Sequence, residues 1–175
     1  MTNPSVLVAL ACAILSATSA RAQDGPGPAG SDMAVEVTPY VFLGSLTSSG
    51  VGAAVRWPLA SHLSVELETS YRRAEASNLS SNLSILFDFP QMGRVTPYVV
   101  GGVGLDQYNT AEFLAGRVVT LPKTAFSVNA GGGIRVQADQ NWGIRTDARY
   151  FKDFGRTAPE RWRLYNGVTF GRTRR

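Results

Sequence analysis

The sequence predicts an all-β protein, an eight-stranded antiparallel up-and-down transmembrane β-barrel. First, apolar and polar residues alternate with period two in many segments, and no segment shows a convincing helical period. Second, the pentapeptide VTPYV occurs twice, at 37–41 and at 95–99. Third, short links between the predicted strands tend to alternate with longer ones, as in transmembrane barrels with both termini in the periplasm.

The chain of 175 residues begins with an apolar segment, 6–20, which is too short to span a bilayer as a helix. Ala20 and Ala22 supply the small residues of a signal-peptidase site, so we expect 1–22 to be a cleaved signal peptide, with an anchor helix as the alternative. The Gly/Pro-rich residues 23–32 have nothing to pack and form a linker. The mature chain then contains no cysteine and no disulfide.

The barrel is predicted to occupy 33–171. Its clearest strand is 62–73, where Leu67 and its alternate neighbours are mostly apolar while Glu66 and Glu68 share the polar face. The same period-two pattern gives eight strands, at 34–45, 49–57, 62–73, 80–90, 94–107, 124–137, 141–152 and 161–171.

The repeated pentapeptide fits a ring of eight strands. Its copies begin the first and fifth predicted strands, which would lie half a circumference apart. SHLSVELETSY in the third strand also resembles QNWGIRTDARY in the seventh, so the sequence predicts a four-plus-four repeat. The longest predicted link is QYNTAEFLAGRVVTLPKT, after the fifth strand, and we expect this loop to carry exposed apolar residues or to fold over the barrel mouth.

Alternation is compatible with a soluble barrel that has an apolar lumen and with a membrane barrel that has a polar lumen. The apolar residues of eight strands would overfill so narrow an interior, which favours the membrane barrel. Six acids and six arginines then share the inward parity, and no lysine joins them, which suits a confined network that plugs the lumen. These residues are Glu36, Arg56, Glu66, Glu68, Arg72, Asp88, Asp106, Arg135, Arg145, Asp147, Arg149 and Arg163.

Aromatic residues gather at the strand ends on the outward parity. They predict two girdles of the kind that bilayer interfaces select. Trp57, Phe89, Trp142 and Phe170 would form the periplasmic girdle, and Tyr71, Phe126, Tyr150 and Trp162 the outer one.

The segments PYVVGGVG, FSVNAGGGIRV and NWGIRTDARYF resemble the small OmpA/OmpX-type outer-membrane β-barrel domains, and the resemblance covers 33–171. It implies a place in the bacterial outer membrane, with outer-membrane lipid around the barrel and the barrel-assembly machinery as a partner during biogenesis. Proteins of this family commonly end on an aromatic residue that assists assembly. Here Phe170 is followed by a basic tail at 172–175, a departure from that pattern.

Enzyme chemistry is not expected. Some barrels of this size modify lipid A with a histidine and a serine near the outer leaflet. The sole histidine, His62, lies where the turn before the third predicted strand meets that strand, at the periplasmic end. Glu66 and Glu68 need no catalytic role, because inward arginines account for them. One histidine and no mature cysteine make no metal cluster, and no cofactor motif is present. The net charge of +4 is spread along the chain, which argues against nucleic-acid binding.

The sequence therefore predicts an exported outer-membrane barrel with a structural or surface-interaction role. We expect a surface ligand, where there is one, to contact the loop 106–124. Two alternatives stay open, a small-solute or hydrophobic-compound channel and a secreted soluble ligand-binding barrel.

Overall fold

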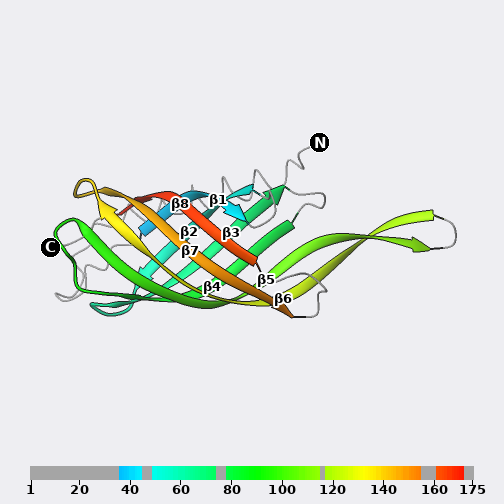
Figure 1. The fold of residues 1–175 in the computed structure, drawn as a ribbon, viewed down its shortest axis with the longest axis horizontal. Helices are drawn as coiled ribbons and strands as arrows, with labels where there is room; N and C mark the ends of the chain where they lie inside the picture. The colour runs from blue at the N-terminus through cyan, green and yellow to red at the C-terminus, as the bar shows by residue number, and fades with distance from the viewer. Residues whose placement is uncertain (1–35, 45–48, 74–77, 115–116, 155–160, 172–175) are drawn as a thin grey trace, which may run out of the picture.

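The computed structural model describes residues 36–44, 49–73, 78–114, 117–154 and 161–171 (Figure 1). The predicted signal peptide 1–22, linker 23–32 and basic tail 172–175 lie outside these residues. The described strands are β1 (Glu36–Gly44), β2 (Ser49–Pro58), β3 (Leu63–Arg73), β4 (Asn78–Asp88), β5 (Val95–Leu114), β6 (Arg117–Gln137), β7 (Trp142–Phe154) and β8 (Arg161–Phe170).

The strands form a closed barrel in sequence order, in which every neighbouring pair is antiparallel and β8 pairs with β1. The predicted eight-stranded antiparallel barrel is confirmed. The two VTPYV copies begin near the starts of β1 and β5, on opposite sides of the ring. Within the described part of the chain, no helix has the length and apolar character needed to cross a membrane.

The prediction of a long loop after the fifth strand is wrong. β5 continues to Leu114 and β6 begins at Arg117, and their ladder runs without a break to the pair Leu114↔Arg117. The run VVTL at 118–121 consists of good strand formers, whereas Pro122 and the neighbouring polar residues had suggested a loop. A proline is tolerated there because β6 pairs with β7 only from Phe126 onward.

The extended parts of β5 and β6, 109–114 and 117–125, are called the ribbon below. The ribbon projects away from the barrel along its long axis, so the expectation that this segment folds over the mouth is also wrong (Figure 1). The predicted alternation of link lengths does not hold either. The end of the barrel from which the ribbon projects is called the ribbon end, and its links are 45–48, 74–77, 115–116 and 155–160. The other end is called the turn end, its links are 59–62, 89–94 and 138–141, and the ribbon-end links are no longer than these as a group.

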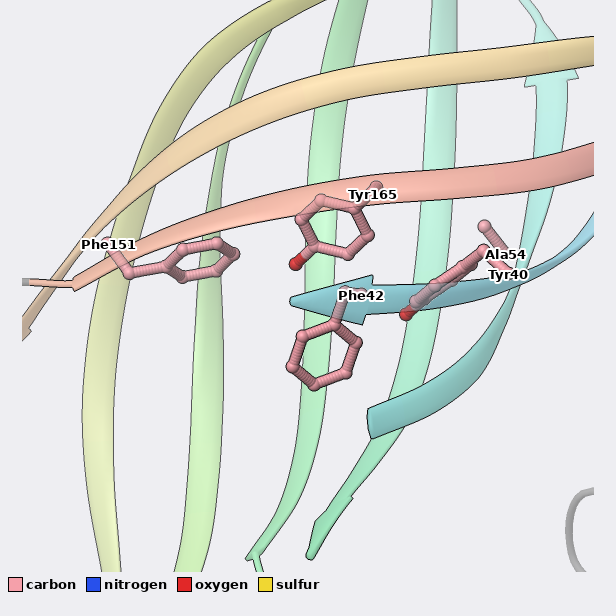
Figure 2. Close-up of a cluster of buried hydrophobic side chains, with 5 residues drawn as sticks. All are labelled: Tyr40, Phe42, Ala54, Phe151 and Tyr165. Carbon is pink, nitrogen blue, oxygen red and sulfur yellow. The ribbon is translucent and has the colours of Figure 1, made fainter. Parts of the chain in front are cut away.

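Apolar side chains cover the outside of the barrel and polar ones line its lumen. In β8, Arg161, Arg163 and Tyr165 are buried while Trp162 and Leu164 between them are exposed. This is the reverse of a soluble barrel that binds an apolar ligand inside. The lumen also holds a hydrophobic cluster, formed by inward side chains of β1, β2, β7 and β8 (Figure 2), namely Tyr40, Phe42, Ala54, Phe151 and Tyr165.

Large inward side chains alternate with glycines around the ring. Gly52 of β2 pairs in register with Tyr40 of β1, and Gly131 of β6 pairs with Arg149 of β7. A Cβ atom on Gly131 would lie 2.9 Å from Cγ of Arg149, closer than side chains approach. Because an eight-stranded barrel has only enough room for its own side chains, each large residue needs a small neighbour.

Candidate functional site

The inward charged residues form three groups at successive heights in the lumen. One lies near the turn end, one in the middle and one near the ribbon end. Strand register decides this arrangement, because residues far apart in the sequence reach the same height only when their strands are staggered correctly.

The turn-end group is a ring of two arginines and two carboxylates. Arg135 lies 2.7 Å from Glu36 and 3.2 Å from Asp88. Arg56 pairs with Asp88 as well, lies 3.7 Å from Glu36, and donates to the Ser64 hydroxyl at 2.8 Å. Each guanidinium therefore contacts both carboxylates, and the positive and negative groups alternate.

The central group joins β7 to β3 across the lumen. The Arg145 guanidinium donates to both oxygens of Glu66, and its Nε lies 2.9 Å from Asp147. Arg149 contacts Glu66 at 2.9 Å, Glu68 at 3.1 Å and Asp147 at 2.9 Å. All five side chains are at least nine-tenths buried. Such planar forks satisfy several carboxylates at once, which burial of so many charges requires.

Two tyrosines complete the hydrogen bonding of the central group. The Tyr98 hydroxyl donates to Asp147 and accepts from Nε of Arg145 at 2.6 Å, and the Tyr165 hydroxyl donates to Glu68 at 3.2 Å. The Arg145 guanidinium also stacks 5.0 Å above the Tyr98 ring. The sequence analysis did not single out Tyr165, although it shares the parity of Arg163 on β8.

The ribbon-end group contains two residues that the sequence analysis missed. Arg161 lies 2.6 Å from Asp106 and 2.9 Å from Asp153, and Arg163 lies 3.6 Å from Asp106. Asp153 was missed because the predicted strand ended at 152, and Arg161 because it stands at a strand start. Both share the parity of inward neighbours on their strands, and this signal was sufficient to find them.

The Arg163 guanidinium lies between two aromatic rings, with centroids 4.3 Å away for Phe151 and 5.0 Å away for Phe42. Its charge is thus shared between cation–π contacts and Asp106. Of the predicted charged residues, Arg72 is the one not in these groups. It is half-buried on β3 and pairs in register with Gly50.

Two cavities among these groups are water-sized. One cavity, lined by Tyr40, Glu68, Arg149 and Tyr165 among others, has room for about one water molecule. A second at the turn end, beside Glu36 and Arg135, has room for about two.

The aromatic residues predicted to form girdles all lie on the outer wall and are exposed or half-exposed. Trp57, Phe89, Trp142 and Phe170 lie toward the turn end. Near the ribbon end, the Tyr150 and Trp162 rings are 5.4 Å apart, and Phe126 contacts Phe154, which was not predicted, at 6.0 Å. Tyr71 lies on the same wall, in the part of β3 near the ribbon end.

His62, Glu66 and Glu68 are the residues that the sequence analysis weighed for catalysis. His62 is exposed in the turn 59–62, and its Nδ1 lies 3.1 Å from the carbonyl oxygen of Asp88. Glu66 and Glu68 are each paired with Arg149 in the central group. Among the described residues, no group of His, Cys, Asp or Glu side chains is placed to hold a metal ion.

Comparison of the sequence with protein-family models and with curated proteins finds no match. Solved structures do match. The N-terminal β-barrel domain of Pseudomonas aeruginosa OprF superposes with a TM-score of 0.68 at 14% identity, over 79% of this chain and 96% of that one. Neisserial surface protein A gives a TM-score of 0.58 at 15% identity, over 79% and 94% of the two chains.

The outer membrane enzyme PagL gives a TM-score of 0.50 at 11% identity, over 79% of this chain and 99% of that one. The shared fold thus includes an enzyme as well as a surface protein. At such low identities the likeness concerns the fold, and it agrees with the strand order and the inside-out distribution of side chains. The chain has the fold of the small OmpA-type outer-membrane β-barrels.

Proposed function

We propose that this chain is an exported outer-membrane protein whose lumen is closed by its arginine–carboxylate groups, and that it acts as a structural or surface-interaction protein rather than an enzyme. In this proposal lipid surrounds the apolar outer wall, the signal peptide is removed on export, and the barrel-assembly machinery inserts the chain. The ribbon end faces the cell exterior.

The observation that carries the proposal is the reversed distribution of side chains. Leu43 and Ile85 are 61% and 56% exposed on the outer wall, whereas Glu66 is fully buried in the lumen. In water such a surface would be a large apolar patch, while in a bilayer it meets acyl chains. The closed barrel also satisfies every strand edge within the wall, as hydrocarbon requires.

The three charged groups support the proposal that the lumen is closed. A solute would have to separate the Arg56 and Arg135 pairs, then those of Arg145 and Arg149, then those of Arg161. Breaking one partner out of a buried ion pair costs about 3–5 kcal/mol, so passage through all three groups is strongly disfavoured.

The ribbon supports a role in surface interaction. β5 pairs with β4 only as far as Tyr108, and β6 pairs with β7 only from Phe126. Beyond these residues both outer edges of the ribbon lack a neighbouring strand within the described part of the chain. Unpaired strand edges can add an extended segment of a ligand by main-chain hydrogen bonds. The surface ligand expected at 106–124 would therefore bind along these edges.

Conductance tests the closed lumen. The mature chain, refolded from denaturant into planar lipid bilayers, should insert without steady current steps. A boiling-dependent shift on an SDS gel of the same preparation gives the fraction of chains that is folded. Steady unitary conductance from the folded fraction would instead show the small-solute channel.

Shortening the ribbon tests the surface role. Tyr108 and Lys123 are partners in register, so residues 109–122 can be replaced by Asn-Gly to close a tight hairpin. Bacteria that display the shortened chain should lose attachment to protein-coated surfaces. The shortened barrel should still show the boiling-dependent shift on an SDS gel. Equal attachment by both chains would rule out the ribbon as the contact.

A further inference from the structure

A side-chain amide lies in the middle of the apolar outer wall. Asn166 of β8 points outward and is exposed, four residues from Trp162 and four from Phe170. Thr146 of β7, its partner in register, likewise stands midway between the two girdle residues of its own strand. A strand rises about 3.3 Å per residue, so each girdle is roughly 13 Å away along the strand. Both side chains therefore lie at the centre of an apolar band that is about 25 Å tall in such barrels.

The Asn166 carboxamide is only partly paired within its own barrel. The Thr146 hydroxyl donates to its Oδ1 at 3.0 Å. An amide oxygen accepts two hydrogen bonds and an amide nitrogen donates two, so one acceptor position and both donor positions remain. No other group in the described part of the chain forms a hydrogen bond with them.

Lipid cannot complete this hydrogen bonding. In the bilayer that we propose, acyl chains offer neither donors nor acceptors and water is absent, so an unpaired polar group there is strongly unfavourable. The neighbours of Asn166 on the wall are apolar and exposed, since Leu164 and Val168 flank it on β8 and Val41 is its partner on β1. The carboxamide thus lies within an apolar surface and needs a protein partner.

The chemistry of a carboxamide selects a second copy of this chain as that partner. A primary amide donates and accepts side by side, so two Asn166 side chains that face each other across a two-fold axis form a reciprocal pair of N–H···O bonds. Each Oδ1 then accepts from Thr146 of its own barrel and from Nδ2 of the second copy. A charged partner would instead bring a charge into the hydrocarbon layer, where it is costly.

We propose that two copies of this chain associate within the membrane through the outer wall of β7, β8 and β1. Asn166 and Thr146 form the polar centre of this interface, and the apolar side chains around them exclude lipid. The small side chain of Ala148, which follows Thr146 on the outward face of β7, lets the two walls approach closely. The inference rests on the proposed place of the outer wall in a bilayer, and it is independent of the surface role of the ribbon.

Sedimentation equilibrium of the full mature chain in density-matched detergent micelles tests the interface. The unchanged chain should show a monomer–dimer equilibrium. Asn166→Leu keeps the size of the side chain but removes its hydrogen bonds, so it should raise the dissociation constant of the dimer about 3- to 30-fold. Ser81→Ala removes a polar group from the outward face of β4, on the opposite side of the ring, and should leave this constant unchanged.

Two results would overturn the inference while the membrane barrel stands. One is a monomer at every concentration, from a chain that keeps its boiling-dependent shift on an SDS gel. The other is an equal dissociation constant for Asn166→Leu and the unchanged chain. A chain that folds without lipid or detergent and shows no gel shift would contradict the membrane barrel, and the interface with it.

Urea unfolding in vesicles at a high ratio of lipid to protein separates association from a role in the fold. Under these conditions the barrel is monomeric and its Asn166 amide meets lipid. Asn166→Leu should therefore unfold at a urea concentration no lower than the unchanged chain. A lower midpoint would show that Asn166 supports its own barrel, and this would contradict the inference.

Spin labels locate the interface. Residues 23–175 contain no cysteine, so single labels can be attached to Leu43→Cys on β1 and, as the matched control, to Leu83→Cys on the opposite side of the ring. Both positions are exposed on the outer wall. Pulsed electron paramagnetic resonance in vesicles should give a shorter distance between labels at Leu43 than between labels at Leu83. The reverse order would place the contact on another face and overturn the inference.

Discussion

Neighbouring residues of β3 meet two different surroundings. Leu67 points outward and 46% of its surface is exposed, whereas Glu66 and Glu68 on either side of it point inward and are buried. In the bilayer that we propose, Leu67 meets acyl chains, which accept apolar groups of any shape. Glu66 instead contacts the guanidinium groups of Arg145 and Arg149. A residue on the outer wall that meets acyl chains therefore has to be apolar. A residue on the inner wall has to match its neighbours in polarity, in size and in position.

Removing an inner-wall charge should have the largest effect. Arg149→Ala leaves Glu66, Glu68 and Asp147 without one of their partners, so we expect a loss of about 3–5 kcal/mol in the free energy of unfolding. Urea unfolding in lipid vesicles, followed by tryptophan fluorescence, measures it. Arg149→Lys keeps the positive charge but loses the planar guanidinium fork, so its free energy of unfolding should lie between those of Arg149→Ala and the unchanged chain. An unchanged urea midpoint for Arg149→Ala would show that the central charges are solvated separately.

Placing a charge on the outer wall should cost slightly less. Leu67→Arg puts a guanidinium against acyl chains, and we expect a loss of about 2–4 kcal/mol in folding into bilayers. The same urea titration measures the loss, and Leu67→Ile serves as the apolar control. Equal folding of Leu67→Arg and the unchanged chain would mean that the inward and outward faces are assigned the wrong way round.

Adding volume to the inner wall should come next. Gly52 lies beside Tyr40, and a Cβ on it would also come within 2.6 Å of the Thr69 carbonyl oxygen. Gly52→Val should therefore destabilise the barrel by about 1–3 kcal/mol through overpacking. A neutral result, with retained heat-shift on the gel, would show that the lumen has spare room.

The same addition on the outer wall should have the smallest effect. Gly101 faces outward, and the nearest atom to a Cβ on it is the Asn129 carbonyl oxygen at 3.8 Å. Gly101→Val should change the free energy of unfolding by no more than about 0.5 kcal/mol. A loss as large as that of Gly52→Val would contradict the claim that the two walls differ in their tolerance of size.

Sequence parity predicted the inward or outward face of most of the residues that it assigned to strands, because period two depends only on local alternation. It could not identify the height at which a residue meets its partners. Glu66 and Arg145 are 79 residues apart, and only the stagger of the strands brings them together. The ribbon was missed for a related reason. Pro122 disfavours a central strand, and the sequence does not show that β7 pairs with β6 only from Phe126 onward and therefore does not pair with Pro122.

Contact between the apolar outer wall and lipid is the most direct test of the membrane barrel. The chain contains three tryptophans, Trp57, Trp142 and Trp162, and all of them are exposed on the outer wall. The mature chain would be refolded into vesicles whose acyl chains carry bromine, and its fluorescence compared with that in unbrominated vesicles. We expect strong quenching by the brominated lipid. Equal fluorescence in both vesicles, from a chain that folds without lipid, would contradict the membrane barrel.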